Sequence, residues 1–148
     1  MKKVLIFGTF DGVHDGHRHL IREAMAHGDE LIAVVARDEH VLELKGHVPQ
    51  RQMEERMELI SLETEVALVV PSDEVLGSYV VLTDHAPHVI VFGYDQDVVM
   101  EDVSAWMQDN NIHIQCVQAS AYMPEVYKSS IMNEAQMAEE EESMLETV

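Results

Sequence analysis

The chain has 148 residues, the size of one typical domain, and 47% of them are hydrophobic, which excludes a largely disordered protein. Its 28 acidic and 9 basic residues give a formal net charge of −19, which argues against a nucleic-acid-binding surface. No run approaches the ~20 apolar residues of a membrane span, and the single cysteine, Cys116, excludes an internal disulfide. We therefore expect a cytoplasmic protein that binds neither nucleic acid nor membranes.

Apolar runs alternate with amphipathic stretches along the chain. In chain order we expect a strand at 4–7, a helix at 17–28, a strand at 30–36, a helix at 52–62, a strand at 66–71, an ambiguous segment at 78–87, a strand at 88–93, a helix at 103–111, a strand at 112–118 and a helix from about Ser129. In the ambiguous segment, β-branched residues favour a strand and the order of elements favours a helix. This alternation is typical of βαβ units with right-handed crossovers. It predicts a Rossmann-like three-layer α/β/α fold with a five-stranded parallel sheet.

No linker or internal repeat marks a second domain. We expect one domain at 1–137, followed by an acidic tail at 138–148. The tail is predicted to be a solvated extension, and an acidic recruiting arm is the alternative.

The stretch "GTFDGVHDGH" lies between the first strand and the first helix. In open parallel sheets, ligands bind beyond the carboxyl ends of the strands, so this stretch should border the ligand. A helix that begins near Asp15 directs free N–H groups to the same place, and His14 and His17 can face one anion there. Two alternatives are a zinc site that includes Asp11 or Asp15, and surface histidines without a ligand.

Nucleotidyl transfer requires this kind of site, because a crowded and highly negative transition state has to be positioned and neutralised. Imidazoles can donate hydrogen bonds to phosphate oxygens. Ser129 and Ser130 precede an apolar helical stretch, where they can cap the helix and bind an anion, or act as a cap alone.

The sequence resembles the HxGH nucleotidylyltransferase superfamily through "TFD" followed by "HDGH", and the resemblance extends from Lys3 to about Glu134. It is similar to the cytidylyltransferase-like branch, which includes glycerol-3-phosphate cytidylyltransferases and archaeal-type FAD synthases. The "ARD" and "GYDQ" forms are most similar to those of the FAD synthases.

The resemblance implies a role for each matching residue. His14, His17 and Lys45 would act in catalysis, with Lys45 on a mobile loop. The residues implied to contact the nucleotide are Gly8, Thr9, Phe10, Asp11, Gly16, Arg56, Gly93, Tyr94, Asp95, Ser129 and Ser130. Mg²⁺ would be carried by the nucleotide without protein ligands, and the resemblance implies a homodimer.

Two positions depart from the family pattern. Near the serine pair only Lys128 is basic, and His47 stands where basic residues are frequent in the family. Either Lys45, Arg51, Arg56 and Lys128 together supply the positive charge, or turnover is weak.

The resemblance implies transfer of a nucleoside monophosphate from a triphosphate to a phosphorylated acceptor, with release of pyrophosphate. The first expectation is ATP plus FMN giving FAD. The second is cytidylyl transfer from CTP to glycerol 3-phosphate or a similar phospho-alcohol. A catalytically weak nucleotide-binding module is the third.

Overall fold

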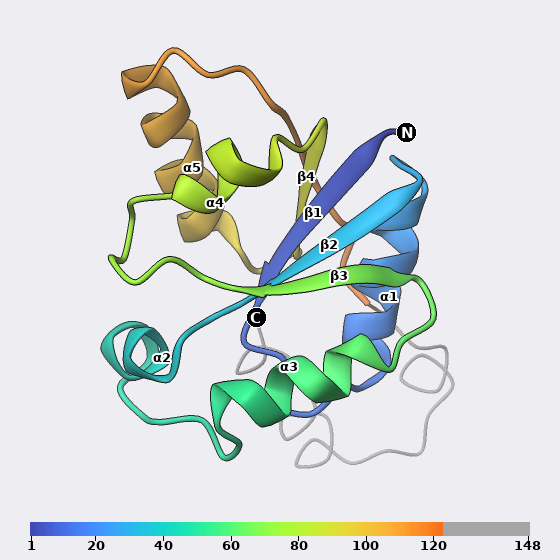
Figure 1. Cartoon of the computed structure of the whole chain (residues 1–148), viewed down its shortest axis with the longest axis vertical. Coiled ribbons are helices and arrows are strands. Elements are labelled where there is room, and N and C mark those ends of the chain that lie inside the picture. Colours follow the sequence, from blue (N-terminus) through green and yellow to red (C-terminus); the bar gives the residue numbers. More distant parts are fainter. Residues whose placement is uncertain (123–148) are drawn as a thin grey trace.

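The computed structural model describes residues 1–122. Within this range the elements are β1 (Lys3–Gly8), α1 (Asp15–Met25), β2 (Glu30–Val35), α2 (Asp38–Lys45), α3 (Met53–Ser61), β3 (Val66–Pro71), α4 (Val80–His85), β4 (Val89–Phe92), α5 (Asp97–Asp109) and β5 (Gln115–Gln118). The strands form one sheet in the order β3-β2-β1-β4-β5, with every neighbouring pair parallel (Figure 1). The predicted Rossmann-like α/β fold is confirmed.

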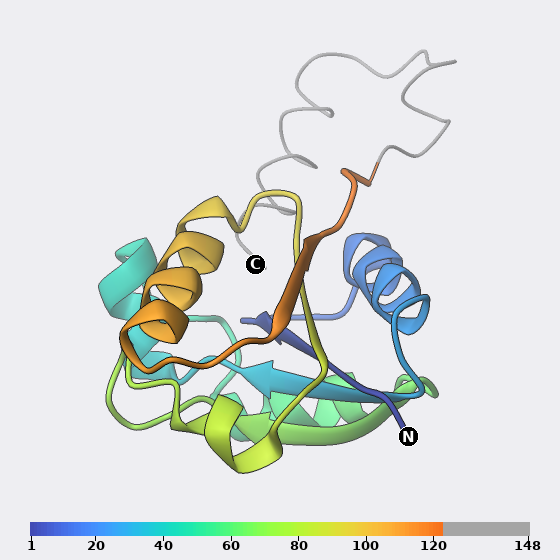
Figure 2. The same cartoon turned by 90° about the horizontal axis from the view of Figure 1, so that it is seen from above.

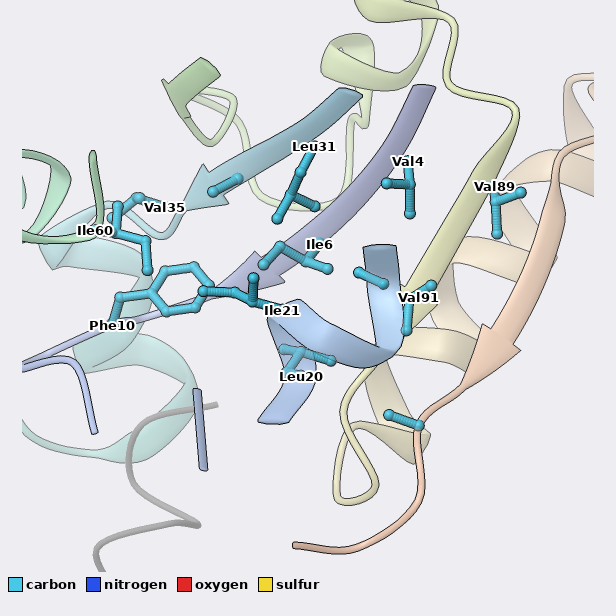
Figure 3. Packing of buried hydrophobic residues seen from close by; sticks show 13 residues of the cluster. Val4, Ile6, Phe10, Leu20, Ile21, Leu31, Val35, Ile60, Val89 and Val91 are labelled. Carbon is cyan, nitrogen blue, oxygen red and sulfur yellow. The ribbon is translucent and has the colours of Figure 1, made fainter. Parts of the chain in front are cut away.

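Helices cover both faces of the sheet, and α1 and α5 lie on opposite sides of it in Figure 2. On one face, α1 and α3 pack against inward residues of β1, β2 and β4, and Ile21 and Ile60 lie near Ile6 and Phe10 (Figure 3). On the other face, α4 and α5 pack through Leu82 and Val103. Both faces are apolar because a central parallel strand is buried on both sides.

Two helices differ from the expectation. Residues 38–45 form α2, which was not predicted, although its signals are present: Asp38 and Glu39 lie in the first turn, and Gly46 ends the helix at a φ of 79°. Helix α5 begins at Asp97 rather than at residue 103. The ambiguous segment contains α4, so the order of elements was a better guide there than β-branching.

The centre of the sheet opens toward the carboxyl ends of its strands. β1 and β4 are paired only at Val4–Val89 and Leu5–Ile90. From β1 the sheet continues through β2 and β3 on one side and through β4 and β5 on the other. This reversal of strand order is the place where open α/β sheets bind ligands.

Within residues 1–122 no helix is long and apolar enough to cross a membrane. The predicted last helix, with Ser129 and Ser130, and the predicted tail at 138–148 lie outside the described residues.

Candidate active site

The two histidines of the "HDGH" stretch form the N-terminal cap of α1. His14 is the N-cap residue, and its Nδ1 accepts a hydrogen bond from the backbone N–H of Gly16 at 3.0 Å. The backbone N–H of His14 in turn donates to Nδ1 of His17 at 3.2 Å. This reciprocal arrangement is a capping box in which imidazoles replace the usual hydroxyl and carboxylate groups. It explains locally why two histidines three residues apart lie together at the start of the helix.

The cap also determines where each imidazole carries its proton. Both Nδ1 atoms accept hydrogen bonds, so the neutral rings hold their proton on Nε2. The rings are stacked with centroids 4.0 Å apart and planes 17° apart. His14 and His17 therefore place two stacked imidazoles beside the positive end of the α1 dipole, which is a suitable arrangement for phosphate oxygens.

Phe10 packs against the imidazole of His17. It has a φ of 53° and is fully buried, and its ring meets His17 edge-on at 5.2 Å between centroids. A Cβ atom at Gly8 would lie 2.6 Å from the Phe10 ring, so only glycine fits there. Phe10 thus holds the His17 ring by an edge-on contact, and the backbone of Gly8 stays close to the site.

The loop from Gly93 to Asp95 forms the opposite side of the site, and two glutamines hold it. Gln96 Oε1 accepts from the backbone N–H of Gly93 at 2.7 Å, and Gln96 Nε2 donates to the carbonyl of Phe7 at 3.0 Å. Gln118 Nε2 donates to the carbonyl of Tyr94 at 3.1 Å. Gln96 therefore bridges β1 and β4 beyond their last paired residues.

A first cavity lies between the histidines and this loop. It brings together six of the residues implied by the family resemblance, which are His14, Gly16, His17, Gly93, Tyr94 and Asp95. The rest of its lining consists of His19 and Leu20 of α1 and of Ala119, Ser120 and Tyr122, which follow β5.

A second, larger cavity of about 390 Å³ lies on the other side of Asp95. Gly8, Thr9, Lys45 and Asp95 line it, so the two cavities share Asp95. Lys45 is the last residue of α2, and not part of a loop as the resemblance implied, because Gly46 caps the helix directly after it. The charge of Lys45 is close enough to stabilise the ionised form of Asp95.

Asp95, which lines both cavities, has a raised pKa. Burial raises the pKa of Asp95 to about 6; a hydrogen bond from its own backbone and the charge of Lys45 oppose this shift, and the charge of Asp97 adds to it. Its Oδ1 atom is buried and has no hydrogen-bond partner among residues 1–122. The folded protein therefore keeps this proton to a higher pH than the unfolded chain does.

The raised pKa predicts a pH-dependent effect of Asp95→Asn. The stability that the protonated carboxyl contributes is fully present below its ordinary pKa of 3.8 and is lost as the pH rises through about 6. Asparagine stays neutral, so the variant should gain more in melting temperature over the wild type at pH 8 than at pH 5. Thermal unfolding of both proteins at the two pH values measures this. An equal difference at both would contradict the assignment.

Arg56 and Asp11 lie beside the cavities and do not line them. Arg56 is fully buried in α3, and its guanidinium donates to the carbonyls of Thr9 at 2.6 Å and Ala36 at 2.8 Å. Asp11 accepts from the backbone N–H groups of Gln50 at 2.7 Å and Arg51 at 3.0 Å. In this structure both side chains hold the loops around the site, and we propose that they position the nucleotide-binding backbone.

A cluster around His19 was missed by the sequence analysis. His19 Nε2 lies 3.0 Å from the carbonyl oxygen of Ser120, and the Ser120 hydroxyl donates to Glu23 at 2.6 Å. This hydrogen bond lowers the pKa of Glu23. The cluster ties the segment after β5 to α1. The spacing of His19 and Glu23, four residues apart on one helix face, was the available signal. No pattern in the sequence indicated a role for Gln118. Gln96 is part of the "GYDQ" form that contributes to the family resemblance.

Comparison with known proteins agrees with this geometry. The profile of the cytidylyltransferase-like family matches residues 5–139. The chain belongs to the cytidylyltransferase-like family. Among its relatives in that family is the FAD synthase of Thermococcus sibiricus, which is 31% identical over 129 residues, covering 87% of this chain and 84% of the relative. The FAD synthase of Thermoplasma acidophilum is 31% identical, with coverages of 89% and 92%.

A solved structure supports the same membership. The lipopolysaccharide core biosynthesis protein from Thermoplasma volcanium superposes with a TM-score of 0.76 at 30% sequence identity, covering 83% of this chain and 99% of that one. Relatives named FAD synthase match this chain over most of its length. This cytidylyltransferase-like protein is therefore a nucleotidyltransferase.

Proposed function

We propose that the protein is an FMN adenylyltransferase, which transfers AMP from ATP to FMN and releases pyrophosphate. The observation that carries the proposal is the pair of stacked imidazoles at the N-terminus of α1, whose Nδ1 atoms both accept hydrogen bonds from backbone N–H groups. The choice of FMN as acceptor is supported by relatives named FAD synthase, which are about 31% identical to this chain.

In this reaction a phosphate oxygen of FMN attacks the α-phosphorus of ATP. The bond between the α-phosphorus and the oxygen bridging to the β-phosphate breaks, and pyrophosphate leaves with that oxygen and its electron pair. No covalent enzyme intermediate is needed. His14 and His17 would donate hydrogen bonds to the phosphate oxygens as negative charge develops there. Lys45 would approach the phosphates from the second cavity.

Phosphate binding in this protein has to act against a net charge of −19 on the chain. The acidic chain as a whole repels a triphosphate, so local N–H groups and the dipole of α1 have to overcome that repulsion at short range. Gly16 and His17 lie in the first turn of α1, where the positive end of the dipole is concentrated.

Magnesium would enter with the triphosphate. In residues 1–122 no three His, Cys, Asp or Glu side chains are grouped so that they could hold a metal ion. Mg²⁺ is usually ligated by substrate phosphates, waters and one or two carboxylates. An ion that is carried by ATP is therefore compatible with a site that has no cluster of metal-binding side chains in the described residues. When bound, it would neutralise part of the charge on the phosphates.

The test is pyrophosphate release with magnesium, in which ATP and CTP are each combined with FMN and with glycerol 3-phosphate. We expect release only with ATP plus FMN, and FAD as the chromatographed product. Release with CTP plus glycerol 3-phosphate would replace the proposal with cytidylyl transfer. A variant that lacks His14, purified in the same way, controls for contaminating activity.

A further inference from the structure

The second cavity is much larger than a phosphate group requires. Its volume of about 390 Å³ lies in the range of pockets that hold a whole small-molecule ligand, roughly 300–1,000 Å³. Helix α2, the segment 72–79 and the first turn of α5 surround it, and most of the side chains that line it are apolar. A three-carbon phospho-alcohol would leave most of this apolar space filled with water.

Aromatic rings form one side of the cavity. Tyr79 and Phe7 both line it, and their rings meet edge-on with centroids 6.1 Å apart. The Tyr79 hydroxyl donates to Asp102 at 2.5 Å, which holds the ring in place. Trp106 packs against Tyr79 at 5.9 Å, outside the cavity lining. A rigid aromatic side chain on an apolar cavity is suited to a flat ring system.

The mouth of the cavity carries exposed apolar side chains that no described residue covers. Leu44 on α2 is 63% exposed, Val75 and Leu76 are 69% and 42% exposed, and Val98 on α5 is 77% exposed. Exposed apolar side chains gathered around a cavity are typical of a binding site.

The base of the segment 72–79 is anchored, which holds its apolar tip at the mouth. Arg37 Nε donates to the carbonyl of Ser72 at 2.7 Å, and His40 Nε2 lies 3.1 Å from the carbonyl oxygen of Glu74. Asp73 accepts from the backbone N–H of Val81 at 3.2 Å, which ties the start of the segment to α4. The segment that carries Val75 and Leu76 is therefore tied to both α2 and α4.

Asp95 lines both cavities and so marks where they meet. The two cavities share Asp95, so a molecule with its phosphate at His14 and His17 would have the rest of its length beside the second cavity. We propose that the second cavity binds the flat isoalloxazine ring of the flavin acceptor, with Leu44 and Leu76 as contacts that determine specificity. This inference rests on the proposed function.

Riboflavin is the probe of choice, because it carries the ring without the phosphate and its binding does not depend on catalysis. Trp106 is the chain's only tryptophan, so quenching of its emission reports ring binding near Tyr79. We expect Leu44→Ser and Leu76→Ser each to raise the riboflavin Kd and the KM for FMN about tenfold, with the KM for ATP within about twofold of the wild type. Both residues are exposed, so neither change should unfold the protein.

Leu42→Ser is the matched control. Leu42 is also an exposed leucine of α2, at 48%, but it does not line the cavity, so its variant should bind riboflavin as the wild type does. Unchanged riboflavin binding in both the Leu44 and Leu76 variants would overturn the assignment, even if FAD is formed. Absence of riboflavin binding to the wild type would overturn it as well. Leu44-dependent riboflavin binding without FAD formation would support the ring site while refuting the proposed reaction.

Discussion

Replacing His14 with asparagine should lower kcat by about 100- to 1,000-fold, the range typical for loss of one donor to a developing negative charge. Asparagine is among the best N-cap residues, so it can accept the hydrogen bond from Gly16 that His14 Nδ1 accepts now. It cannot place an N–H where the imidazole Nε2–H lies. The variant therefore separates the catalytic role of His14 from its capping role, and steady-state rates of pyrophosphate release measure the effect.

The comparison with His14→Ala completes this test. Alanine removes both the donor and the cap, so that variant should lose the same activity and also about 1 kcal/mol of unfolding free energy. The asparagine variant should stay within about 0.5 kcal/mol of the wild type. Full turnover in the asparagine variant would show that the Nε2–H of His14 has no part in the reaction.

Replacing Arg56 with methionine should lower the free energy of unfolding by about 3–5 kcal/mol. Methionine approximates the length of the side chain but donates no hydrogen bond. The carbonyls of Thr9 and Ala36 would lose their bonds to the guanidinium, and Asp38 would lose an ion pair at 2.7 Å. The cost is large because the guanidinium is fully buried and water cannot replace its bonds. Denaturation with urea, monitored by circular dichroism, measures it.

Arg22 provides the control for this substitution. It is an exposed arginine in the last turn of α1, and Arg22→Met should change the unfolding free energy by less than about 0.5 kcal/mol. If Arg56→Met were no more destabilising than Arg22→Met, the four hydrogen bonds of Arg56 would not contribute to stability as their geometry indicates.

The sequence by itself determined the features that depend on neighbouring residues. Apolar runs predicted the strands of the parallel sheet, because its central strands β1, β2 and β4 are buried on both faces. The "HDGH" spacing placed His14 and His17 at the start of a helix, and the capping hydrogen bonds there span only two and three residues. The alternation of elements placed this stretch at the carboxyl edge of the sheet.

Only the tertiary structure decided the features that join distant residues. Arg56 bonds to Thr9 across 47 positions, and Gln96 bonds to Phe7 across 89. Nothing near Arg56 in the sequence shows that its guanidinium lies inside the protein, because burial of a charge is decided by the partners that surround it. The second cavity is likewise a space left between α2, the segment 72–79 and α5. Its size depends on how these elements pack, which no local pattern of residues encodes.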